Sequence, residues 1–191
     1  MTDIENILRF FAINNLQHTE AYAKNQIILK KFLNEYMASK ANITNKECDD
    51  LRNIFSRTID LVYSTLGTNA FNNVSFKNLS EGKFSTQYVP KFHPTIFEAI
   101  SCAYCYASNK INVLSIDKAS LKQKHLDLLN NDEFKDSISN RTTNIENIKK
   151  RISLATKFLF NLTYDWNQYS THIWLPKWIN WYKRLYCIGP F

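Results

Sequence analysis

The sequence predicts an all-α fold: a multi-helix bundle with one long irregular loop at about 68–94 and an aromatic C-terminal tail. Apolar residues recur every three or four positions in most segments, which is the helical period. Side chains suited to helix N-termini precede several of these segments. The periodicity fails between about 68 and 94, where asparagines, Gly82 and Pro90 accumulate, and only short extended pieces are expected there, around 74–76 and 88–89. With 191 residues, the chain is long enough for one domain with a sizeable core.

Three helices are predicted in the first third of the chain. The first begins with Asp3 as N-terminal cap and ends near 14–15, because its apolar residues Ile4, Ile7, Leu8 and Phe11 share one face. The second spans about 22–39 and is amphipathic. Thr44 and Glu47 have the spacing of a capping box, so a third helix begins there and ends at Gly67.

Four further helices are predicted after the loop. Pro94 suits a first helical turn, and the small apolar residues that follow, up to Ala107, indicate a helix at the centre of the core. Two helices span about 117–130 and 132–139, the second with Asp132 as its cap. Asn144 caps a last helix that continues through Leu159.

Composition predicts a cytoplasmic protein that does not bind membranes. Asp3 and Glu5 occupy the place of the positive region of a signal peptide, and no apolar stretch of about 18 residues could cross a bilayer. The four cysteines are therefore expected to be reduced thiols. No metal, cofactor or catalytic residue is assigned from the sequence.

The formal charge of +7 is concentrated in the second half of the chain, since 110–157 holds ten basic and six acidic residues. Such a surface favours weak, salt-sensitive contact with nucleic acid, although solvated helix faces have the same composition. The residues that would form a phosphate-contacting patch are Lys122, Lys124, Arg141, Lys149, Lys150 and Arg151.

Six short segments resemble, in order and spacing, the helical C-terminal part of the domain of unknown function 262 family, which includes the GmrSD-type restriction proteins. The segments are Leu8-Arg9-Phe10-Phe11-Ala12, Lys31-Phe32-Leu33-Asn34-Glu35-Tyr36-Met37, Asn69-Ala70-Phe71, Phe97-Glu98-Ala99, Asp132-Glu133-Phe134 and Lys150-Arg151-Ile152. The resemblance covers roughly 4–160. It implies a role in defence against foreign modified DNA.

In that family a ParB/sulfiredoxin-like nucleotide-processing head with an Asp-Gly-Gln-Gln-Arg signature precedes this region, and some members carry an HNH nuclease domain after it. This sequence has glycine only at Gly67, Gly82 and Gly189, so the head signature is not in it. The resemblance therefore implies a non-catalytic helical domain or subunit of a restriction-like anti-phage protein, with a partner chain that carries the head.

A different hypothesis is a small self-contained nuclease or hydrolase with a site near His93 and Glu98, at the end of the loop. Cys102 and Cys105 have the spacing of half a zinc site, but no second pair follows, and packing inside a buried helix explains them better.

The aromatic tail, 163–191, is predicted as a segment separate from the helical domain, 1–162. It contains all four tryptophans. The tail is expected to pack on the bundle or to dock a partner, although its composition also fits an interfacial membrane helix or an unstructured terminus. The docking stripe, at helical spacing, consists of Trp174, Trp178, Trp181 and Leu185.

Overall fold

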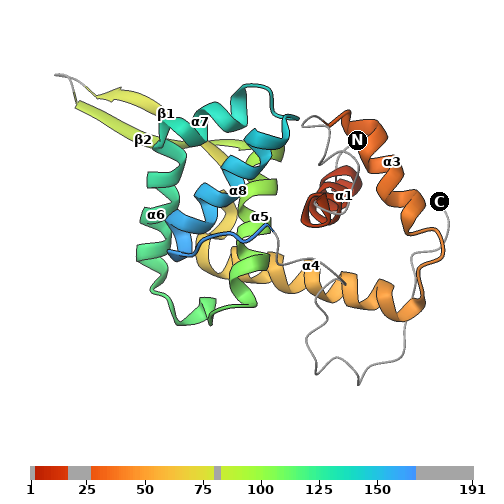
Figure 1. Cartoon of the computed structure of the whole chain (residues 1–191). Coiled ribbons are helices and arrows are strands. Elements are labelled where there is room, and N and C mark those ends of the chain that lie inside the picture. Colours follow the sequence, from red (N-terminus) through yellow and green to blue (C-terminus); the bar gives the residue numbers. More distant parts are fainter. Residues whose placement is uncertain (1–2, 17–26, 80–82, 167–191) are drawn as a thin grey trace.

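The computed structural model describes residues 3–16, 27–79 and 83–166 (Figure 1). Within these ranges the chain is mostly helical, with seven α-helices and a two-stranded sheet. The helical class predicted from the sequence is therefore confirmed in broad terms, and the sheet is a correction to the all-α prediction. No helix in the described ranges combines the length and hydropathy needed to cross a bilayer.

The helices begin and end close to the predicted positions. They are α1 (Asp3–Asn14), α3 (Leu29–Ser39), α4 (Asn45–Leu66), α5 (Pro94–Ser108), α6 (Lys118–Asn130), α7 (Asp132–Ser139) and α8 (Ile145–Phe160). Two short 3₁₀ helices, Gly67–Asn69 and Val113–Ser115, connect them to the following segments. The helix predicted from about 22 is an exception, because it begins at Leu29, and Ile28, its N-cap, has an extended backbone; residues 17–26 lie outside the described residues.

Side-chain caps determine where several helices begin. The Thr44 hydroxyl accepts from the Glu47 amide at 3.2 Å, and the Glu47 carboxylate accepts from the Thr44 amide at 2.9 Å, which confirms the capping box. Asn144 caps α8 as predicted. The cap of α7 is Asn131 rather than Asp132, because Asp132 already lies in the first helical turn and the Asn131 oxygen accepts from the Phe134 amide at 2.9 Å.

Helix α5 forms the centre of the molecule, as the sequence predicted. Every residue from Thr95 to Ala107 is buried. One apolar cluster joins α5 to α4, α6, α7 and α8, and a second joins it to α1, α3 and α8. In Figure 1, α5 lies in the middle of the body with α4 and α8 beside it. The side chains of α5 therefore meet helices from both ends of the described chain.

The segment predicted as an irregular loop is a β-hairpin. Strands β1 (Asn72–Leu79) and β2 (Lys83–Phe92) pair antiparallel and project from the helical body (Figure 1). The short extended pieces expected around 74–76 and 88–89 lie inside these strands. Asparagine, lysine and serine, which are poor strand formers, separate the apolar residues. The alternation that identifies a strand is therefore weak in this sequence.

Candidate functional site

Three charged side chains from distant parts of the chain meet at the side of α5. Glu98 is 2% exposed, and each of its oxygens accepts a hydrogen bond from an arginine. Arg9 of α1 donates from Nη1 to Oε1 at 2.9 Å, and Arg151 of α8 donates from Nη2 to Oε2. This ion cluster ties the first and last described helices to the central one.

The surroundings of the ion cluster satisfy most of its remaining hydrogen-bonding groups. Arg151 Nη1 donates to the Thr142 carbonyl at 2.9 Å and to the Ser137 carbonyl at 3.3 Å. Arg9 also pairs with Glu5 of its own helix at 2.7 Å. Two guanidinium groups thus face two carboxylates, which is the balance that buried charges require.

His93 lies next to the ion cluster, at the N-cap of α5. Its Nδ1 lies 2.9 Å from the Thr95 hydroxyl, with which it shares a hydrogen bond. Burial and the nearby Lys91 charge lower the pKa of His93, against the opposing effect of Glu98. Both Glu98 oxygens are already bonded to guanidinium groups, so the geometry favours a structural ion cluster over an acid/base pair with His93.

The predicted phosphate-contacting residues do not form one compact patch. Arg151 is 1% exposed and bonded to Glu98, so its inclusion in a surface patch was wrong. Lys124 reaches the Leu159 carbonyl at 3.5 Å, whereas Lys149 lies over the Trp166 ring, 5.9 Å from its centroid. Leu159 lies ten residues after Lys149 on α8, a distance of about 15 Å along the helix. Lys124 and Lys149 therefore lie at well-separated parts of α8.

Lys122 and Arg141 are exposed, and Lys150 is partly exposed. They lie on α6, in the connection between α7 and α8, and on α8 respectively. A role in phosphate contact for these three residues stays a prediction.

The buried cysteines belong to the core. Burial raises the pKa of Cys105 to about 11 and raises the pKa of Cys102 as well, so both remain protonated thiols at neutral pH. The Cys102 sulfur accepts from the Asn14 amide at 3.3 Å. Among the described residues no three histidine, cysteine or acidic side chains are grouped as metal ligands.

The first residues of the aromatic tail pack on the bundle. Tyr164 is buried between Tyr106 and Trp166, with ring centroids 4.5 Å from each. The Trp166 indole nitrogen donates to the Ser153 hydroxyl at 3.1 Å. The predicted docking residues, Trp174, Trp178, Trp181 and Leu185, lie outside the described residues.

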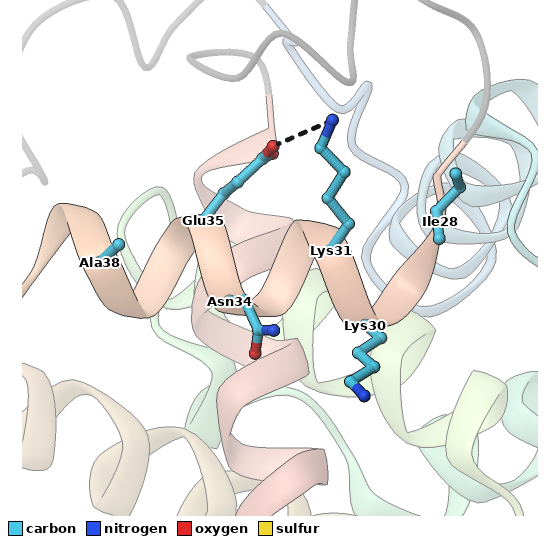
Figure 2. A pocket seen from close by; sticks show the side chains of 6 residues that line it. All are labelled: Ile28, Lys30, Lys31, Asn34, Glu35 and Ala38. Atoms are coloured by element: carbon cyan, nitrogen blue, oxygen red, sulfur yellow. Dashed lines mark ion pairs between the residues drawn. The ribbon is translucent and has the colours of Figure 1, made fainter.

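An open groove runs along the outer side of α3 (Figure 2). Its described lining comes from one helix and the residue before it, and Lys31 and Glu35, one turn apart on α3, form an ion pair at 3.7 Å. The side chains drawn in Figure 2 are Ile28, Lys30, Lys31, Asn34, Glu35 and Ala38. Because a single helix and the residue before it supply all of the described lining, its polar side chains do not converge on a common point, as they would in an active site.

The hairpin is anchored to the body by a tyrosine–histidine pair. The Tyr88 hydroxyl of β2 lies 3.2 Å from His125 Nδ1 on α6, and the two rings are stacked. Burial lowers the pKa of His125 from 6.5 to about 4, against a smaller opposing effect of the Ala70 backbone. The folded protein therefore holds this imidazole in its neutral form.

We expect stability to fall as the pH is lowered from 6.5 to about 4, the folded-state pKa of His125. In this window the unfolded chain binds a proton at His125 that the folded chain does not bind, so the free energy of unfolding falls by an amount on the order of 3 kcal/mol. Urea unfolding at several pH values measures the slope. The His125→Phe variant keeps a ring against Tyr88 and should lose this part of the pH dependence; an unchanged slope would contradict the assignment.

Comparisons with protein-family models, with curated proteins and with solved structures returned no match to this chain.

Proposed function

We propose that this chain is a non-catalytic helical module of a restriction-like anti-phage defence protein, and that it acts by contacting a partner. The proposal rests on the observation that segments which resemble the family, although far apart in the sequence, meet in the core of the fold. Arg9, Glu98 and Arg151 come from three of these segments, separated by up to 142 positions, and they meet in one buried ion cluster.

Apolar residues from the same segments also come together. Phe10, Phe32 and Ile152 lie with Phe97 in one buried cluster, and the Phe71 ring packs edge-on against Phe97 with centroids 5.0 Å apart. A further segment places Phe134 in the other core cluster. Residues that resemble the family in sequence are thus residues that hold this fold together, which supports the assignment to the module.

The chemistry of the ion cluster supports a structural role. Its acid is bonded on both oxygens, and its two arginines are engaged by carboxylates and main-chain carbonyls. A catalytic acid or base needs a proton-transfer path to substrate. A module built in this way would transmit its effect through its surface, while catalysis would belong to the chain that carries the head.

The surface of α1 and α3 is suited to contact such a partner. Ile4 and Ile28 are each 70% exposed, and Met37 is 56% exposed. Apolar side chains are often the anchors of protein interfaces. In the resembling family the head precedes α1, so Ile4 is where contact with the head chain would begin.

We expect the purified chain to show no nuclease or nucleotidase turnover with Mg²⁺ and to form a complex with a ParB/sulfiredoxin-like head chain of the resembling family. Size-exclusion chromatography and calorimetry measure the complex, and Ile4→Asp should weaken it at least tenfold. The control variant is Asp60→Asn, on the exposed face of α4, which should leave the complex unchanged. Ile59→Asp would not serve as a control, because the Ile59 side chain packs on the core.

Two results would contradict the proposal. One is metal-dependent turnover that disappears in both His93→Ala and Glu98→Gln proteins that remain folded, which would favour a self-contained hydrolase. The other is a failure of the chain to bind any head chain supplied with it.

A further inference from the structure

The base of the β1–β2 hairpin, 72–75 and 86–92, covers a buried histidine on α6. His125 is 1% exposed, and the Tyr88 ring is stacked on it with ring centroids 6.0 Å apart. Tyr88 and Val74, which pair across the two strands, are only partly buried and pack against the core cluster that contains α6. The other sides of α6 face α4, α7 and α8. Water therefore reaches His125 most easily where the hairpin base lifts from α6.

In the described part of the chain no charged side chain pairs with His125. Its hydrogen-bond partner is the Tyr88 hydroxyl, 3.2 Å from Nδ1, and the residues of α4, α7 and α8 in the same core cluster are apolar. Lys122, Lys124 and Asp127 are its charged neighbours on α6. Burial lowers the pKa of His125 to about 4, and none of these charges contributes to the shift. A proton on this ring would thus be a charge without a counter-charge or water.

A second attachment of the hairpin base does not involve His125. Phe92, at the end of β2, packs against Phe71 and Phe97, with ring centroids 6.0 and 5.6 Å away. The next residue, His93, donates its amide to the Phe71 carbonyl at 2.9 Å, and its own ring bonds within α5. These contacts are therefore independent of the protonation of His125.

Between the two attachments the strand pairing is irregular. Tyr88 pairs with Val74, whereas Phe92, four residues later, pairs with a residue only two positions earlier in β1. Three residues of β2 therefore stand opposite Asn73 alone. A bulge interrupts the ladder of strand hydrogen bonds and bends the strand. The part of the hairpin that carries Tyr88 is thereby able to move while Phe92 stays on α5.

We propose that the hairpin base is an acid-released strap: a proton on His125 lifts the Tyr88 side of the base from α6, while Phe92 remains as its pivot. The Tyr88 hydroxyl oxygen can accept a hydrogen bond from the protonated ring, but one neutral partner does not replace the water that a buried charge loses. Lifting the base restores that water without unfolding the core. This inference does not depend on the proposed function.

The direction and size of the effect follow from proton linkage. The pKa of His125 is about 4 when the hairpin base is closed and returns toward 6.5 when water reaches the ring. The open form therefore binds the proton more tightly, so the ratio of open to closed molecules rises as the pH falls from 6.5 to about 4. The rise is about tenfold for each pH unit and about 300-fold over the whole window.

The test follows the full chain by NMR between about pH 7 and pH 4. The ring shifts of His125 report its protonation, and nuclear Overhauser contacts between the His125 and Tyr88 rings report closure. We expect both to change with one common midpoint. The Phe92 ring should keep its contacts with Phe97, and Tyr104, which is fully buried in the core, should keep its folded shifts. Circular dichroism at each pH checks that the helices stay folded.

Two variants remove the titrating group. His125→Phe keeps a ring against Tyr88, and His125→Gln keeps a neutral bonding partner for the hydroxyl, so the test does not depend on one variant folding. In both, Tyr88 should stay against α6 over the same pH range. His93→Gln is the matched control, and it should release the hairpin base with the midpoint of the parent.

Three results would overturn the inference. The first is protonation of His125 while the contact between its ring and Tyr88 persists. The second is loss of the contacts between Tyr88 and α6 at the same pH in both His125 variants. The third is a single transition in which the Phe92 contacts and the Tyr104 shifts are lost together with the Tyr88 contact, because protonation would then unfold the protein as a whole.

Discussion

Replacing Glu98 with alanine should lower the free energy of unfolding by about 3–5 kcal/mol, because it leaves two guanidinium groups without their shared carboxylate. Arg151 is almost fully buried and cannot turn to water. Glu98→Gln keeps the shape of the side chain but removes its charge, and it should lose a comparable amount. Urea denaturation at neutral pH measures both changes.

Glu5 provides the matched control. It bonds to the same Arg9, but its side chain is 21% exposed, so Glu5→Ala should cost about 1 kcal/mol or less. If the Glu98 variants are no less stable than the Glu5 variant, the buried ion cluster does not contribute to stability as proposed. Replacing all three members by apolar residues of similar volume tests its role further, since such replacements can be neutral in stability.

The helices could be predicted because each has local signals. Thr44, Pro94 and Asn144 mark helix starts, and Gly67, with a φ of 76°, marks the end of α4. These signals act over three or four residues and depend little on the rest of the fold. The β1–β2 hairpin has no comparable local signal, since Tyr88 and Phe92 are fixed by rings that only the folded body supplies.

The ion cluster could not be predicted as a unit, because its members are far apart in the sequence. One signal for Arg151 was nevertheless present. It lies three residues after Ile148 and four before Ala155, which places it on the apolar face of α8 rather than on the charged one. Its place in the triplet with Lys149 and Lys150 suggested a surface patch, whereas its helical position relative to Ile148 and Ala155 favours the interior.

Phe97→Ala should be the other severe substitution, with a loss of about 3–5 kcal/mol from the cavity it leaves. Phe97 is buried on α5 and contacts the rings of Phe71, which precedes β1, and Phe92, the last residue of β2. Its truncation should therefore also loosen the β1–β2 hairpin relative to the helices. Chemical denaturation measures the first effect, and hydrogen exchange of the β1 and β2 amides measures the second.

Phe134→Ala separates these two effects. Phe134 is also buried, on α7. Its core cluster touches the hairpin at Val74 and Tyr88, but its ring is not one of those that pair at the base of the hairpin, which are Phe71, Phe92 and Phe97. We expect a loss of about 3–5 kcal/mol here as well, without selective loss of protection in the hairpin. If both variants change hydrogen exchange in the hairpin only in proportion to global stability, the rings at its base do not orient it. Selective loss of protection in Phe97→Ala alone would show that α5 sets the direction in which the hairpin leaves the helical body.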